Sequence, residues 1–177
     1  RGSEKNVLDR FYNASKKYKL DAVIRVCADN PFVDRDEINL LVEKYIKAKI
    51  KKDYYFNHRN YKNFTYSDGF GAELIKFSTL KRLFNTANNN EDREHVTSLI
   101  WRKKNEFEMV PCKTKINKKY HHIVCDINNI QDWDFAKILY KTPTKATQIN
   151  ALDQVGQMNG GGVPHFKASM SGAISSA

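Results

Sequence analysis

The chain has 177 residues, of which 41% are hydrophobic and 12% aromatic, which is enough to form one globular domain with an apolar core. No apolar run approaches the roughly 20 residues that a membrane-spanning helix needs, so we predict no membrane insertion. The formal net charge is +10, but the lysines are spread along the whole sequence without a nucleic-acid-binding motif, so we predict no nucleic-acid partner.

The first predicted elements are a helix over residues 6–18 and a strand over residues 21–28. The strand has an apolar run without turn residues, which is typical of a strand buried on both faces in a parallel sheet. Asp29 follows at its carboxyl end, where ligands bind in open α/β sheets. Arg25, inside the strand, needs an anionic partner, which is either a bound phosphate or an internal acid.

The rest of the chain alternates between helices and short strands. Further helices are predicted after Asp34, after Ser78, and over residues 93–102 and 132–141. Strands are predicted over residues 53–56, 72–77, 109–112 and 122–126. This alternation predicts an α/β fold with a mostly parallel sheet.

The composition changes after Lys141, and residues 156–177 are rich in Gly, Ser and Ala. We therefore predict a folded domain over residues 1–141 and a linker or tail over residues 142–177. Three widely spaced cysteines, Cys27, Cys112 and Cys125, are typical of free thiols in a reducing compartment, which predicts a cytoplasmic protein.

Several segments together resemble one family, the cytidylyltransferases of the spore-coat-polysaccharide type, which are related to the CTP-dependent enzymes that activate sialic and KDO-type acids. The resemblance covers residues 2–141 in order. It rests on Gly2-Ser3, Val7-Leu-Asp-Arg-Phe-Tyr12, Arg25-Val-Cys-Ala-Asp29-Asn-Pro31, Thr65-Tyr-Ser-Asp-Gly69, Glu73, Asp92-Arg-Glu-His-Val-Thr97, Ile123-Val-Cys-Asp126 and Asp132-Trp133.

The resemblance implies a three-layer, Rossmann-like α/β fold of the nucleotide-sugar type and a homodimer. It also implies a cytoplasmic nucleotidyltransferase that moves CMP from CTP to an acidic, 3-deoxy-ulosonic or sialic-like sugar in surface polysaccharide or glycoconjugate biosynthesis. Two departures stand out. The family's first strand and its basic triphosphate-binding loop have no counterpart here, so we expect an N-terminally truncated domain that can be inactive as a fragment. Gly71 stands where the family commonly has an acid.

The resemblance also implies roles for individual residues. Asp29 and Asp126, at the ends of predicted strands, match the family's Mg²⁺ ligands, and one or two carboxylates with phosphate and water are typical of Mg²⁺ sites. Arg25 would meet the nucleotide, and His95 would bind or orient the sugar. The remaining predicted substrate contacts are Asp9, Arg10, Asp68, Glu73 and Glu94.

Structural roles compete with each of these assignments. An internal ion pair would explain Arg25, a turn would explain Asp29 and Asp68, and helix capping would explain His95. Two other functions also fit the fold: a glycosyltransferase that uses a nucleotide sugar, and a degenerate domain without catalytic activity. The predicted site is therefore a hypothesis that depends on the ordered set of motifs.

Overall fold

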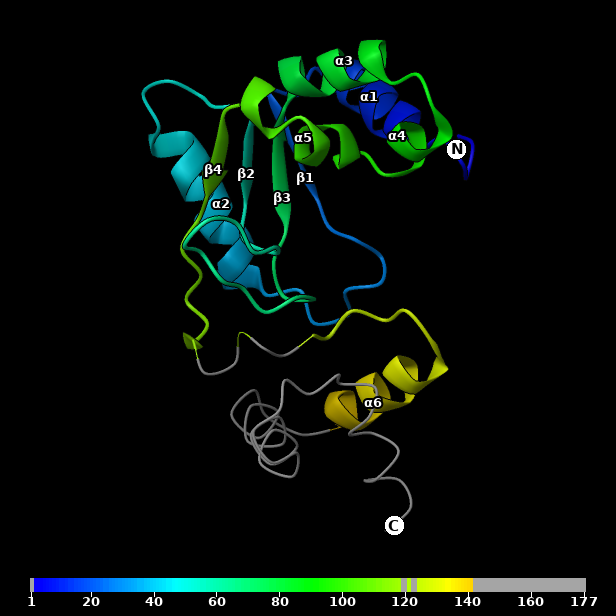
Figure 1. Cartoon of the computed structure of the whole chain (residues 1–177), viewed down its shortest axis with the longest axis vertical. Helices are drawn as coiled ribbons and strands as arrows, with labels where there is room; N and C mark the ends of the chain where they lie inside the picture. Colours follow the sequence, from blue (N-terminus) through cyan, green and yellow to red (C-terminus); the bar gives the residue numbers. More distant parts are fainter. Residues whose placement is uncertain (1, 119–120, 122–123, 142–177) are drawn as a thin grey trace. The chain divides into compact units, whose positions relative to one another are not determined.

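A computed structural model describes residues 2–118, 121 and 124–141 (Figure 1). The chain forms two compact units, each built from three stretches of sequence. The described part of the chain contains no helix that is long and apolar enough to cross a membrane. The first unit comprises Arg1–Arg25, Ile38–Asn57 and Ala72–Cys112, and the second comprises Val26–Glu37, His58–Gly71 and Lys113–Ala177.

The first unit is organised by a four-stranded sheet with the order β1-β3-β2-β4. Its strands are β1 (Ala22–Arg25), β2 (Tyr54–Phe56), β3 (Glu73–Lys76) and β4 (Met109–Pro111). β3 pairs antiparallel with β1 and β2, whereas β2 and β4 pair in parallel. β1, β2 and β4 therefore run in one direction, and only β3 of these four strands runs against them. Because three of the four strands share a direction, the sheet confirms the prediction of a mostly parallel sheet.

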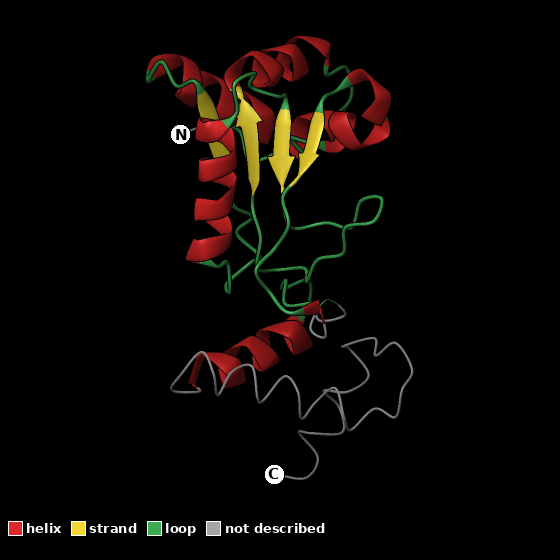
Figure 2. Ribbon diagram, turned by 90° about the vertical axis from the view of Figure 1, so that its left-hand side faces the viewer, coloured by secondary structure: helices red, strands yellow, loops and turns green. Residues whose placement is uncertain are grey.

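Alternating side chains on the sheet bury both of its faces. Tyr54 and Phe56 pack edge-on against Trp101, with ring centroids 6.0 and 5.0 Å away. Tyr55, between them, points to the opposite face and packs with Leu41 and Tyr45 of α2 (Arg35–Lys47). Because successive strand residues face opposite ways, this arrangement gives the three layers that were predicted, with α2 along one face (Figure 2).

The remaining helices of this unit are short, and two of them begin with an asparagine side chain that caps the first turn. In α1 (Val7–Lys17), the Asn6 side chain accepts a hydrogen bond from the Asp9 N–H. Tyr12 of α1 stacks on Phe84 of α3 (Phe77–Thr86), with ring centroids 4.1 Å apart. α4 (Asn90–Glu94), α5 (Ser98–Arg102) and a 3-10 turn (Lys104–Glu106) follow.

Two predictions about this unit were wrong. β1 ends at Arg25, and Ile24 is 36% exposed, so the strand is not buried on both faces. The predicted helix over residues 93–102 is interrupted at residues 95–97, between α4 and α5. The interruption turns the buried Thr97 hydroxyl toward Glu73, and this long-range contact outweighs local helix propensity.

In the second unit, α6 (Ile130–Lys141) confirms the predicted C-terminal helix. Its start is fixed by reciprocal capping: the Asn129 side chain accepts from the Asp132 N–H, and the Asp132 carboxylate accepts from the Asn129 N–H. Trp133, in the first turn of this helix, is 49% exposed. Of the predicted strand over residues 122–126, the described part contains one bridge, Asp68↔Val124, and residues 122–123 lie outside the described residues, as does the predicted tail.

Candidate functional site

Arg25 and Glu73 face each other on neighbouring strands of the first unit. They are register partners in the β1–β3 pair, so their side chains lie on the same face of the sheet. The Arg25 guanidinium forms a salt bridge with the Glu73 carboxylate. The Glu73 side chain is 2% exposed and that of Arg25 is 19% exposed. Glu73 is therefore an internal acid of the kind that Arg25 was expected to need.

Two hydroxyl groups also contact the Glu73 carboxylate. The Tyr54 hydroxyl from β2 donates to it, and the Thr97 hydroxyl donates at 2.8 Å. Burial and then the negative charge of Glu73 hold the pKa of Tyr54 well above its ordinary value, so Tyr54 stays a hydrogen-bond donor. The structure thus places Glu73 inside the protein, and its predicted contact with substrate stays a prediction.

The second unit brings together the segments that carry Asp29, Asp68 and Asp126. The Cys125 N–H donates to the Asp68 carbonyl at 3.1 Å, and the Ile127 N–H donates to the Asp29 carbonyl at 2.8 Å. The residues on either side of Asp126 therefore form backbone hydrogen bonds with Asp68 and Asp29. Asp29 itself is exposed, in a turn beyond the end of β1.

The carboxylates of this group influence one another electrostatically. Burial, followed by the negative charge of Asp126, raises the pKa of Asp68 above its ordinary value. The charge of Asp29 adds a smaller effect in the same direction, while His58 and the Gly69 N–H oppose it. Like charges raise a carboxyl pKa only when they are near, so the three aspartates form one acidic region, which we call the aspartate group.

Gly69 allows the close approach of the two backbones in this region. Its φ is +89°, and a Cβ at this position would lie 2.6 Å from the Cys125 carbonyl carbon and 2.8 Å from the Asp126 nitrogen. Only glycine has both the left-handed conformation and the space that this contact requires. Gly69 was seen in the sequence only as a turn residue, although it sets the spacing between Asp68 and Asp126.

The aspartate group has one feature that fits a metal ion. The Asp126 Oδ1 atom is buried and has no hydrogen-bond partner among the described residues, whereas Oδ2 accepts from the Asn128 amide at 2.6 Å. A buried carboxylate oxygen without a partner is costly, and a cation would satisfy it. Within the described residues, no three His, Cys, Asp or Glu side chains are close enough together to hold a metal by themselves.

The other predicted site residues lie on two helices of the first unit or directly after one of them. Asp9 and Arg10 are on α1, where Asp9 accepts from the Asn13 amide and Arg10 is exposed. Glu94 and His95 are exposed at the end of α4, and the His95 N–H donates to the Glu91 carbonyl. The structure joins Arg25 with Glu73, and Asp29 with Asp68 and Asp126, and the predicted roles of all these residues in substrate binding stay predictions.

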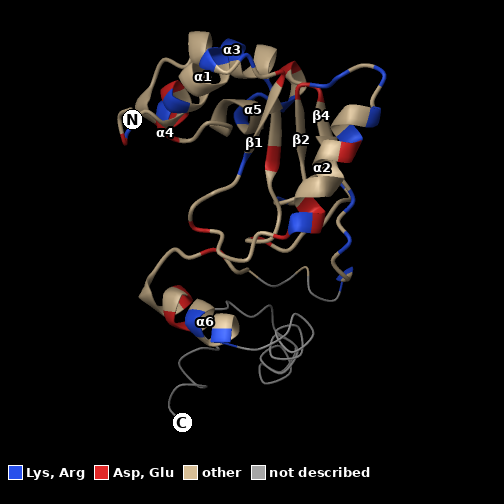
Figure 3. Ribbon diagram, turned by 180° about the vertical axis from the view of Figure 1, so that it is seen from behind, with Lys and Arg blue, Asp and Glu red and all other residues tan. Residues whose placement is uncertain are grey.

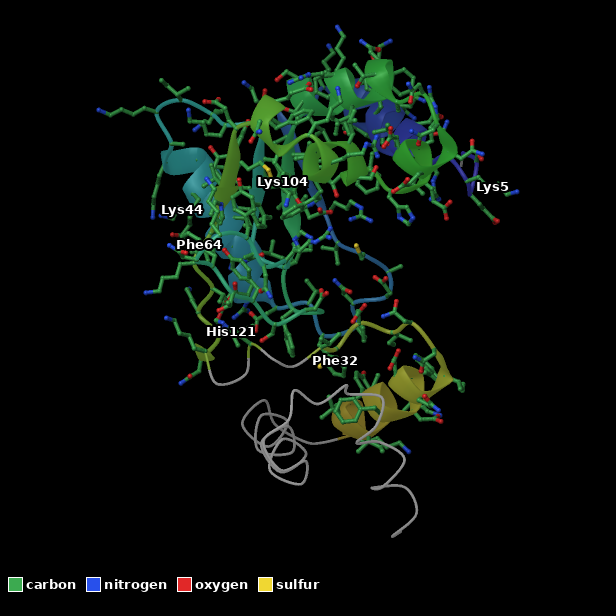
Figure 4. All side chains as sticks on the ribbon, in the orientation of Figure 1. Lys5, Phe32, Lys44, Phe64, Lys104 and His121 are labelled. Carbon is green, nitrogen blue, oxygen red and sulfur yellow. The ribbon has the colours of Figure 1, made fainter. Side chains whose placement is uncertain are left out.

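A further polar contact in the second unit was not anticipated. The His121 side chain, labelled in Figure 4, has Nδ1 2.7 Å from the Thr65 hydroxyl and Nε2 3.1 Å from the Ile116 carbonyl. Because the carbonyl can only accept, the His121 Nε2–H is the donor in that contact. Lys and Arg residues occur in each of the described helices α1 to α6 (Figure 3).

Comparison with known proteins identifies the family. The family model described as "Cytidylyltransferase" matches residues 1–159. The chain belongs to the cytidylyltransferase family. The solved structure of a cytidylyltransferase from Leptospira borgpetersenii has the same fold, with a TM-score of 0.75 and 18% identity over 92% of this chain and 68% of that one.

Two curated relatives align with this member of the family. The uncharacterized protein MJ1063 of Methanocaldococcus jannaschii is 34% identical over 133 residues, which is 75% of this chain and 51% of MJ1063. The spore coat polysaccharide biosynthesis protein SpsF of Bacillus subtilis is 22% identical over 160 residues, which is 90% of this chain and 63% of SpsF. The chain thus spans about half of MJ1063 and under two thirds of SpsF.

Proposed function

We propose that the protein to which this chain belongs transfers CMP from CTP to an acidic sugar of the 3-deoxy-ulosonic or sialic-like class. The proposal is supported by family membership and by the aspartate group, in which Asp126 is held between the segments of Asp29 and Asp68. The printed name of SpsF refers to spore coat polysaccharide, and we propose surface polysaccharide or glycoconjugate biosynthesis as the setting of this reaction too.

The proposed reaction is a nucleotidyl transfer. A sugar hydroxyl oxygen attacks the α-phosphorus of CTP, the bond from that phosphorus to the bridging oxygen of the β-phosphate breaks, and pyrophosphate leaves with the electron pair. The hydroxyl proton passes to a base or to water. Such reactions depend mainly on positioning and on neutralising phosphate charge, so acids and bases held by the fold are the residues that matter.

We propose that Asp29 and Asp126 hold a Mg²⁺ ion, which would neutralise charge on the triphosphate. The unpartnered Asp126 Oδ1 supports this assignment, and Mg²⁺ commonly takes one or two carboxylates, with phosphate and water as its other ligands. Arg25 is proposed to bind nucleotide phosphate, and His95 to orient the sugar. Asp9, Arg10, Asp68 and Glu94 are the proposed further contacts to substrate.

The test is pyrophosphate release by the full-length protein supplied with CTP, Mg²⁺ and a panel of acidic sugars. Release should require CTP together with one sugar, and should fall by about 100-fold or more in Asp126→Asn. Asn128→Ala, which removes only the neighbour of Oδ2, is the matched control and should retain most of the activity. No release with any sugar from folded protein would refute the proposal, and transfer from a nucleotide sugar instead would indicate a glycosyltransferase.

We further propose that the full-length protein is a cytoplasmic homodimer. Sedimentation of the purified protein at micromolar concentration measures its mass in solution. A mass of one subunit across that range would refute the dimer.

A further inference from the structure

We propose that Glu73 is a positioning residue for Arg25: its carboxylate fixes the direction of the Arg25 guanidinium so that Arg25 can bind the phosphates of CTP. This inference rests on the proposed function, because it assumes that the ligand is a nucleoside triphosphate. It assigns Glu73 a role through Arg25 and not through contact with the sugar.

The two oxygens of the Glu73 carboxylate have separate tasks. Oε2 accepts from Arg25, whereas Oε1 accepts from the hydroxyls of Tyr54 and Thr97. The two hydroxyl donors come from β2 and from the interruption between α4 and α5, so the carboxylate is held from two separate elements. A carboxylate fixed through one oxygen presents the other in a constant direction, which is the condition for orienting a neighbouring cation.

The geometry of arginine transmits this orientation. The guanidinium is planar and carries five N–H donors in a fixed fork, so an ion pair through one N–H, together with the side chain's attachment to β1, restricts the directions of the others. Planar donors of this kind match phosphate oxygens, which lysine contacts only as a point charge. A fixed guanidinium therefore loses little conformational entropy when an anion binds.

The burial of the pair is uneven, and this unevenness points to a ligand. The Glu73 side chain is 2% exposed, whereas the side chain of Arg25, which is the last residue of β1, is 19% exposed. A buried ion pair is often no more stabilising than an apolar pair of similar size, so stability alone gives weak reason for this arrangement. Because Glu73 is the more buried member of the pair and Arg25 the more exposed one, the positive charge of Arg25 is the one that an anion arriving from solvent meets first.

The pair also links the motifs that carry the family resemblance. Arg25, Glu73 and Thr97 come from three separate motifs and meet at one carboxylate. Thr97 donates to the Glu73 Oε1 and is 7% exposed. Thr97→Val removes this donor while preserving the shape of the side chain, and the Tyr54 hydroxyl still donates to the same oxygen, so it is a milder form of the same perturbation.

The test is a double-mutant cycle on CTP affinity, measured by calorimetry on the full-length protein with Mg²⁺. Arg25→Ala and Glu73→Gln should each weaken CTP binding about tenfold or more, and the double variant should bind no more weakly than Arg25→Ala, because Glu73 acts only through Arg25. Thr97→Val should weaken CTP binding by no more than about threefold, because the Tyr54 hydroxyl still donates to the Glu73 Oε1. CMP, which lacks the β- and γ-phosphates, should be affected less than CTP by all these changes.

Arg25→Lys provides a second variant that keeps the charge and the pairing with Glu73. It should still lose about tenfold in CTP affinity, because an ammonium lacks the planar fork. Wild-type affinity in Arg25→Lys or Glu73→Gln, or additive losses in the double variant, would overturn the inference while leaving the proposed function intact. If the wild-type protein binds no CTP at all, the proposed function and this inference both fail.

Discussion

Gly69→Ala should destabilise the second unit by an amount that follows from the backbone geometry. An alanine at φ +89° costs about 1–2 kcal/mol in the left-handed region. Its Cβ would also lie 2.6 Å from the Cys125 carbonyl carbon, and relieving such an overlap by moving backbone costs about 1–3 kcal/mol. The two costs together predict a loss of roughly 2–5 kcal/mol in the free energy of unfolding.

Gly2→Ala is a matched control for this change. Its Cβ would lie 2.7 Å from the Arg10 Cγ, almost the same distance, but the neighbour is a flexible, exposed side chain that can move away. We expect a change within about 0.5 kcal/mol. Urea unfolding followed by circular dichroism measures both variants, and Gly69→Ala should lower the midpoint by about 1 M or more. Equal midpoints for the two variants would refute the reasoning that the close approach requires glycine.

Three further predictions concern titrating groups. Burial alone would raise the pKa of Asp92, but hydrogen bonds, led by the one from Arg102, lower it below its ordinary value. Ionised Asp92 therefore stabilises the fold above the ordinary pKa, and this stabilisation is lost as the pH falls through the lowered pKa. Asp92→Asn should therefore lose stability at pH 7 and show less acid dependence in urea midpoints between pH 5 and pH 2. Burial and a neighbouring aspartate raise the pKa of Asp68, so its ionisation costs stability as the pH rises above the unfolded value. Asp68→Asn should stabilise the metal-free protein at pH 7 but not at pH 3, and a stabilisation that does not change with pH would contradict this. Burial raises the pKa of Cys125 to about 12, so iodoacetamide at pH 8 should label the partly exposed Cys27 well before Cys125, as mass spectrometry of the native protein would show.

The elements that the sequence predicted correctly are those specified by local pattern. The apolar spacing over residues 6–18 and 132–141 and the aromatic run over residues 53–56 matched α1, α6 and β2. The pattern failed where a distant contact decides the structure. Residues 93–102 have helical spacing, but the hydrogen bond from Thr97 to Glu73, 24 positions away, interrupts the helix, and no window of local sequence contains that information.

The candidate site could likewise be predicted only in part from the sequence. Asp29 and Asp126 could be selected because each lies at the end of a predicted strand, and Asp68 because it belongs to the Thr65-Tyr-Ser-Asp-Gly69 motif of the resemblance. Their convergence depends on backbone hydrogen bonds between distant segments and on the space that Gly69 leaves, which are three-dimensional facts. Arg25 was expected to need an anion, and only the strand register identified Glu73, rather than a ligand, as that anion in the structure.

The backbone contacts around Asp126 have a consequence for the order in which the protein folds. Residues 125 and 127 bind the carbonyls of Asp68 and Asp29, so these contacts span 57 and 98 positions of sequence (125 − 68 and 127 − 29). Closing such long loops is slow and entropically costly, whereas α1 or the β2–β3 pair can form from nearer residues. On the ribosome, the aspartate group cannot assemble until Asp126 has emerged from the exit tunnel, so the acidic region is completed after the sheet of the first unit has had time to form.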